Sequence, residues 1–98
     1  MYRIAIGDDA LKVLAELNRL VARCLEREGL ERDRDYAIDY YSSASPLRLA
    51  LGRDKSRYQL VLLDVEFGVD NGLTVAASLR EKNAEFSLIY ITSPRDFV

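Results

Sequence analysis

Four side chains that could do chemistry each follow a short apolar run: Asp8 and Asp9, then Asp64, then Thr92. If these runs are strands of one parallel sheet, their carboxyl ends meet at the edge where such sheets hold their working residues. Neighbouring first and third strands then bring the three carboxylates together. Carboxylates this close repel one another, and a hard divalent cation with oxygen ligands offsets the repulsion. The pattern predicts a Mg²⁺ site made by Asp8, Asp9 and Asp64.

The same residues suit phosphoryl transfer. A carboxylate can carry a phosphoryl group as an acyl phosphate, so Asp64 is the predicted nucleophile. Thr92 would offer its hydroxyl to a phosphoryl oxygen. Taken singly, each aspartate is better explained as a loop or helix-cap acid. Their matching places after two apolar strands favour one shared site.

Composition narrows the possible functions. The 98 residues suffice for one small domain, which we place at 1–98. The chain has no histidine, which excludes Ser-His-Asp catalysis and a phosphohistidine of its own. A net charge of −2 and a pI of about 5.1 argue against direct nucleic-acid binding. One cysteine, no long apolar run and no signal-peptide pattern predict a cytoplasmic protein without membrane contact.

The elements that must position these residues alternate between strand and helix. Strand-like runs cover residues 3–6, 36–41, 59–64 and 88–91, and helical patterns cover about 10–28, 45–52 and 73–82. Ser45 followed by Pro46 predicts the start of the second helix. Cys24 falls on the apolar face of the first helix, where we expect it to be buried. The alternation predicts an α/β fold, a doubly wound parallel sheet with right-handed crossovers.

Together these motifs resemble the receiver domain of bacterial two-component response regulators. The resemblance rests on four segments, Ile4-Ala5-Ile6-Gly7-Asp8-Asp9, Leu62-Leu63-Asp64-Val65-Glu66, Asn71-Gly72-Leu73 and Ile89-Tyr90-Ile91-Thr92-Ser93. The long first helix and the Asp-Val-Glu at the acceptor are similar to the subgroup that carries LytTR DNA-binding outputs, the accessory-gene-regulator type. The resemblance implies a flavodoxin-like sheet with strand order 2-1-3-4.

The resemblance also implies a role for each site residue. Asp64 is the phosphoacceptor, Asp9 a direct Mg²⁺ ligand, and Asp8 a residue acting mostly through water. Glu66 gives its backbone carbonyl to the metal, and Thr92 is the switch hydroxyl. The implied partner is a sensor histidine kinase, and the implied output is transcriptional, through a DNA-binding domain outside this segment. Such a domain is not a general enzyme, because it catalyses only its own phosphorylation and dephosphorylation.

Two departures from the family pattern carry further expectations. Phe67-Gly68-Val69-Asp70 stands where the family has Met-Pro-Gly-Met, and losing the proline predicts a looser loop. The chain stops at Val98, before the family's fifth strand, fifth helix and invariant lysine. We therefore expect a C-terminally incomplete receiver domain whose fourth strand is an open edge, and which self-associates.

Two other functions remain open at this point. A non-phosphorylated pseudo-receiver would work only as a protein–protein interaction module. A phosphatase-like enzyme would use Glu66, two residues beyond the nucleophile, as its general acid/base.

Overall fold

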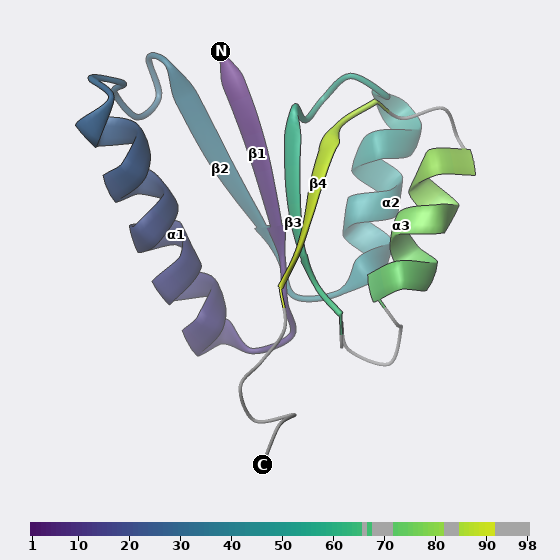
Figure 1. Cartoon of the computed structure of the whole chain (residues 1–98). Helices are drawn as coiled ribbons and strands as arrows, with labels where there is room; N and C mark the ends of the chain where they lie inside the picture. Colours follow the sequence, from purple (N-terminus) through teal and green to yellow (C-terminus); the bar gives the residue numbers. More distant parts are fainter. Residues whose placement is uncertain (66, 68–71, 82–84, 92–98) are drawn as a thin grey trace.

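Four strands and three helices alternate along the chain (Figure 1). The structure is a computed structural model and describes residues 1–65, 67, 72–81 and 85–91. In chain order the elements are β1 (Tyr2–Gly7), α1 (Leu11–Arg27), β2 (Tyr36–Tyr41), α2 (Ala44–Arg53), β3 (Leu60–Asp64), α3 (Gly72–Glu81) and β4 (Ser87–Ile91). The strand and helix positions predicted from the sequence are therefore confirmed, with ends displaced by a residue or so.

The sheet is all parallel, with strand order β2-β1-β3-β4. This confirms the predicted order 2-1-3-4. Gly7, the last residue of β1, is in register with Tyr41 on one side and Leu63 on the other. The three strands therefore end at the same edge, and whatever follows them is brought together there.

The two inner strands are the most buried. The last four residues of β1 and of β3 are all buried, with no alternation between the two faces. That is the pattern of a parallel strand covered on both sides by helices. The apolar run before Asp64 was predicted on this basis, and the prediction is confirmed.

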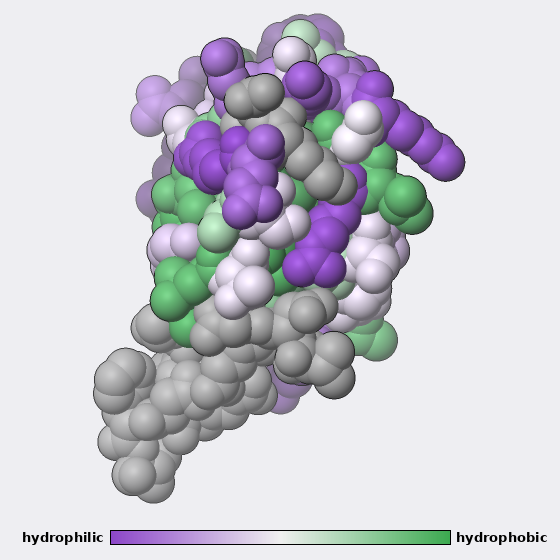
Figure 2. Space-filling view, turned by 90° about the vertical axis from the view of Figure 1, so that its right-hand side faces the viewer, coloured by the Kyte–Doolittle hydropathy of each residue, from purple (hydrophilic) through white to green (hydrophobic). Residues whose placement is uncertain are grey.

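Helices cover both faces of the sheet, α1 on one side and α2 with α3 on the other (Figure 1). Each face has its own core. Leu47, Leu63 and Leu79 lie in the core under α2 and α3, and Ile4, Leu14 and Tyr36 lie in the core under α1. Seen from the α2–α3 side, the surface carries hydrophilic and hydrophobic residues interspersed (Figure 2).

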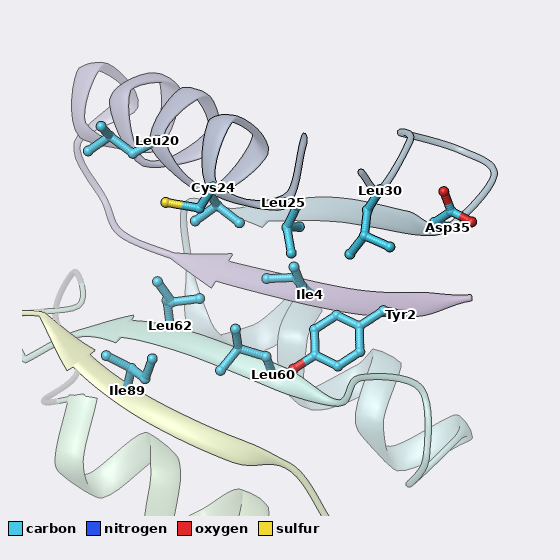
Figure 3. Close-up of a pocket in the computed structure, with 11 residues that line it drawn as sticks. Tyr2, Ile4, Leu20, Cys24, Leu25, Leu30, Asp35, Leu60, Leu62 and Ile89 are labelled. Carbon is cyan, nitrogen blue, oxygen red and sulfur yellow. The ribbon is translucent and has the colours of Figure 1, made fainter. Parts of the chain in front are cut away.

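The α1 side of the sheet carries an apolar groove of about 520 Å³ (Figure 3). Leu20 and Cys24 of α1 form one wall, and Leu62 of β3 and Ile89 of β4 contribute to its floor. Cys24 is exposed, so the prediction that it is buried was wrong. The face of α1 that meets the sheet is set by Leu14 and its helical neighbours, and Cys24 lies on the flank that faces the groove.

The predicted end of α1 is confirmed, and the predicted start of α2 is wrong. Gly29, the predicted stop of α1, has a left-handed φ of 81° just beyond the helix, a conformation that glycine adopts without strain. The second helix begins earlier than predicted: Ser43, not Ser45, occupies the N-cap position, with extended backbone. Pro46 is still accommodated, because the first turn of a helix needs no N–H from its residues.

In the part of the chain that the structure describes, no helix has both the length and the apolar character needed to cross a membrane.

Candidate metal centre

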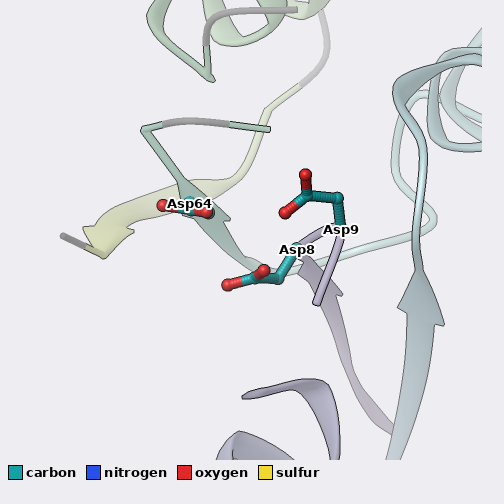
Figure 4. Close-up of side chains that lie close together, drawn as sticks. All are labelled: Asp8, Asp9 and Asp64. Atoms are coloured by element: carbon teal, nitrogen blue, oxygen red, sulfur yellow. The ribbon is translucent and has the colours of Figure 1, made fainter. Parts of the chain in front are cut away.

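Asp8, Asp9 and Asp64 lie together at the carboxyl edge of the sheet (Figure 4). Each offers a carboxylate oxygen, and these oxygens all lie within 4.8 Å of one another. Asp8 and Asp64 are 3% and 2% exposed, while Asp9 is exposed to solvent. The convergence predicted from the ends of the first and third strands is therefore present, because β1 and β3 are neighbours in the sheet.

Backbone hydrogen bonds fix the peptide that carries Asp8. Its N–H donates to the Tyr41 carbonyl at the end of β2, at 3.0 Å. Its Oδ1 accepts the N–H of Ala10, at 2.9 Å, where the chain turns into α1. Aspartate forms such turns readily, because its short side chain reaches the backbone two residues on. Asp8 is thus held from both sides as the chain leaves the sheet.

Two glycines allow the backbone to close tightly around the site. A Cβ added at Gly7 would lie 2.8 Å from Leu63 Cδ2 and 2.9 Å from the Phe67 ring. A Cβ added at Gly72 would lie 2.2 Å from the Asp64 carbonyl oxygen. The Gly72 N–H also donates to the Val65 carbonyl at 2.7 Å. The start of α3 is therefore pressed against the backbone of Asp64, and only glycine fits there.

Phe67 anchors the segment that follows β3. It is 1% exposed and belongs to the core under α2 and α3. The expectation of a looser loop concerned residues 67–70; of these only Phe67 is described, and it is packed against Gly7. Its role was not inferred from the sequence. A large apolar residue three positions after the acceptor aspartate is the signal that could have indicated it.

The donor set fits a hard divalent cation. All three side chains offer oxygen, the ligand atom that Mg²⁺ prefers, and Mg²⁺ characteristically uses one or two carboxylates together with water. Three negative charges within 4.8 Å, two of them buried, repel one another strongly where solvent screening is weak. Asp8, Asp9 and Asp64 are therefore the residues that would hold the ion.

Two predicted site residues lie outside the described residues. Glu66 was assigned a backbone ligand role and Thr92 the switch hydroxyl. Their assignments remain predictions.

The sheet order, the helices on both faces and the acidic edge define the class of the fold: the flavodoxin-like α/β fold of receiver domains. Among solved structures the chain is similar to one described as the MaeR response regulator bound to beryllium trifluoride. That match has a TM-score of 0.67 and 27% sequence identity, and covers 95% of this chain and 68% of that chain. No protein-family model and no curated protein matches the sequence. This similarity confirms the resemblance to a response regulator receiver domain, but it does not identify a subgroup.

Proposed function

We propose that this chain is a phosphoacceptor receiver domain that takes a phosphoryl group onto Asp64 in a Mg²⁺-dependent reaction. The observation that carries the proposal is the buried Asp64 carboxylate within 4.8 Å of two further carboxylates at the carboxyl edge of the sheet. The similarity to a response regulator bound to beryllium trifluoride supports it, because that fluoride imitates a phosphoryl group in shape and charge.

The proposed step is a displacement at phosphorus. An Asp64 carboxylate oxygen attacks, an acyl phosphate bond forms, and the bond from phosphorus to the donor breaks with its electron pair leaving on the donor. Mg²⁺ held by Asp8, Asp9 and Asp64 would offset the negative charge at the site. Asp8, fixed through its N–H and its Oδ1, would keep its carboxylate in place throughout.

These 98 residues contain no histidine, so a phosphohistidine donor must lie outside them. We propose a sensor histidine kinase as that donor, with the phosphoryl group passing from its imidazole nitrogen to Asp64. Water later hydrolyses the acyl phosphate. The domain would be a regulator and not an enzyme with a separate substrate. The output we propose is control of transcription, through a domain of the LytTR type outside these residues.

Intact-mass spectrometry with acetyl phosphate as donor tests the proposal. We expect one phosphoryl adduct that requires Mg²⁺ and is absent in Asp64→Asn. The control is Asp33→Asn, an exposed aspartate that precedes β2 at the opposite edge of the sheet. If the parent protein forms no adduct, the result favours the alternative, an interaction module that is not phosphorylated. An adduct that persists in Asp64→Asn would place the chemistry at another residue.

A further inference from the structure

A chain of side-chain hydrogen bonds runs under the sheet and ends beside the acidic edge. The Tyr58 hydroxyl donates to Asp39 Oδ2 at 2.6 Å. Since its proton is used there, Tyr58 accepts from the hydroxyl of Tyr41, at 2.5 Å. Arg57 Nε also donates to the Tyr58 oxygen, at 3.4 Å. Tyr58 is 1% exposed, whereas its partners are only partly buried: the side chains of Asp39 and Arg57 are 45% and 39% exposed. Loss of the Tyr58 hydroxyl leaves the bond from Tyr41 without its acceptor.

The two tyrosines also pack against each other. Their ring centroids lie 6.2 Å apart with the planes at 86°, the edge-to-face arrangement that aromatic pairs favour. Both lie in or against the core under α2 and α3. The Tyr41 side chain therefore makes one hydrogen bond and one ring contact to Tyr58, in addition to its packing against this core.

Tyr58 reaches these partners from the far side of β1. It precedes β3, whereas Asp39 and Tyr41 lie in β2, and β1 separates the two strands in the sheet. The β1 residue in register with Asp39 is Ala5, which shares the same core as Tyr58. A small side chain at this place in β1 leaves room for the Tyr58 ring to pass. Tyr58 thus ties the edge strand β2 to the segment before β3.

The end of β2 in turn carries the backbone acceptor for Asp8. The Tyr41 carbonyl receives the Asp8 N–H at 3.0 Å, one residue beyond the last paired position of β1. β2 is an outer strand, with β1 on one side only among the described strands. The ends of outer strands open most easily, because few contacts hold them. If the end of β2 opens, the Asp8 peptide loses the bond that fixes its N–H.

We propose that Tyr58 is a positioning residue for the metal ligand Asp8, acting through Tyr41 at the end of β2. The proposal rests on the metal site of the proposed function. Removing the Tyr58 hydroxyl leaves the Tyr41 and Asp39 side chains without their shared partner, which loosens the end of β2 and with it the Asp8 carboxylate. Neither Tyr58 nor Tyr41 belongs to the carboxylate cluster that would hold the ion.

The experiment compares Tyr58→Phe with Tyr36→Phe. Tyr36 is a matched control: it is a buried tyrosine of β2, the strand that also carries Tyr41, and its hydroxyl donates to the Glu26 carboxylate at 3.1 Å. It lies at the other end of β2 and in the other core. Both substitutions keep the ring and remove one hydroxyl. A merely structural role would give both variants the same effects.

Two readouts are measured on each variant. The first is the hydrogen exchange rate of the Asp8 amide without metal, which we expect to rise at least about tenfold in Tyr58→Phe and to stay unchanged in Tyr36→Phe. The second is Mg²⁺ or Mn²⁺ affinity, which we expect to fall by roughly tenfold in Tyr58→Phe alone, the scale of losing a supporting contact. Tyr41→Phe should reproduce both effects, and adding it to Tyr58→Phe should have little further effect.

The outcomes separate the two proposals. Equal hydrogen exchange rates of the Asp8 amide in Tyr58→Phe and Tyr36→Phe overturn the positioning role, whatever the metal affinities of the two variants. If the parent protein binds no metal while Asp8 exchange rises only in Tyr58→Phe, the coupling of Tyr58 to Asp8 stands and the metal site fails. Unchanged metal affinity together with faster Asp8 exchange overturns the claim that this coupling serves the ion.

Discussion

Gly72 and Asp64 approach so closely that a Cβ on residue 72 would lie 2.2 Å from the Asp64 carbonyl oxygen. The first residue of α3 therefore holds the backbone of the proposed phosphoacceptor in place. Ordinarily, replacing a helical glycine with alanine stabilises a protein, because alanine has the better helix propensity. At this position the steric cost exceeds that gain.

We predict that Gly72→Ala lowers the free energy of unfolding by about 1–3 kcal/mol, the usual cost of overpacking. It should also weaken Mg²⁺ binding by roughly tenfold, because the Asp64 backbone must move. Gly52→Ala in α2 is the matched control, since nothing lies within 4 Å of its added Cβ. That variant should be neutral or slightly more stable. Chemical denaturation and metal titration measure both effects, and equal behaviour of the two variants would contradict the prediction.

Asp9 offers the simplest test of the metal site, because its exposed side chain can be changed without disturbing the core. We predict that Asp9→Asn weakens Mg²⁺ or Mn²⁺ binding by about tenfold or more, the scale of one lost charged partner of ~1.5–3 kcal/mol. The shift of the melting temperature with added metal should shrink accordingly. Asp33→Asn should leave both measurements unchanged. If Asp9→Asn binds the metal as tightly as the parent protein, the ion lies elsewhere.

Stability at high pH reports on the Tyr58 hydroxyl. Burial, followed by the hydrogen bonds to Asp39 and Tyr41, raises the pKa of Tyr58 above its ordinary value. The folded state therefore keeps a proton that the unfolded chain loses above about pH 10. Stability is fully present below that pH and falls as the pH rises beyond it.

We predict that the unfolding free energy of the parent protein decreases above about pH 10, with Tyr58 contributing up to ~1.4 kcal/mol per pH unit. In Tyr58→Phe this slope should be smaller, although the variant is less stable at neutral pH. Urea denaturation between neutral and strongly alkaline pH provides the comparison. Parallel curves for the two proteins would show that Tyr58 ionises as easily when folded as when unfolded.

The exposed side of β4 leads us to propose self-association. No described strand pairs with the outer edge of β4, and its Ile89 and Tyr90 are 49% and 41% exposed. Two copies of such an edge can pair antiparallel about a two-fold axis, because each supplies the same backbone donors and acceptors. We predict a dimer at concentrations of about 100 μM, the range that detects weak association.

Ile89→Lys should dissociate this dimer, because a charge in the middle of an edge strand opposes pairing. The control is Leu49→Lys, an apolar position on α2 that is 62% exposed and lies on the other side of the sheet. Sedimentation across a dilution series distinguishes the variants. A parent protein that is monomeric throughout the series would contradict the prediction.

The strands, the sheet order and the three aspartates could be inferred from the sequence alone. Apolar runs such as the one before Asp64 are short, uninterrupted and bounded by polar residues. Whether such a run forms a buried strand therefore depends mostly on its local composition and burial. Their alternation with helices leaves few topologies, and parallel strands bring their carboxyl ends to one edge. The resemblance to receiver domains supplied the order 2-1-3-4, in which the strands that end at Asp8 and Asp64 are neighbours, and the convergence of the two residues followed from that order.

Tertiary packing decided what the local patterns could not. The side of α1 on which Cys24 lies, the start of α2 at Ser43, and the close contact of Gly72 with Asp64 each depend on where a neighbouring element sits. The link from Tyr58 to Asp8 joins residues fifty positions apart, through a ring that crosses β1 and a carbonyl at the end of β2. No spacing along the chain encodes such a contact, because side-chain hydrogen bonds form only after the sheet has set the register of its strands.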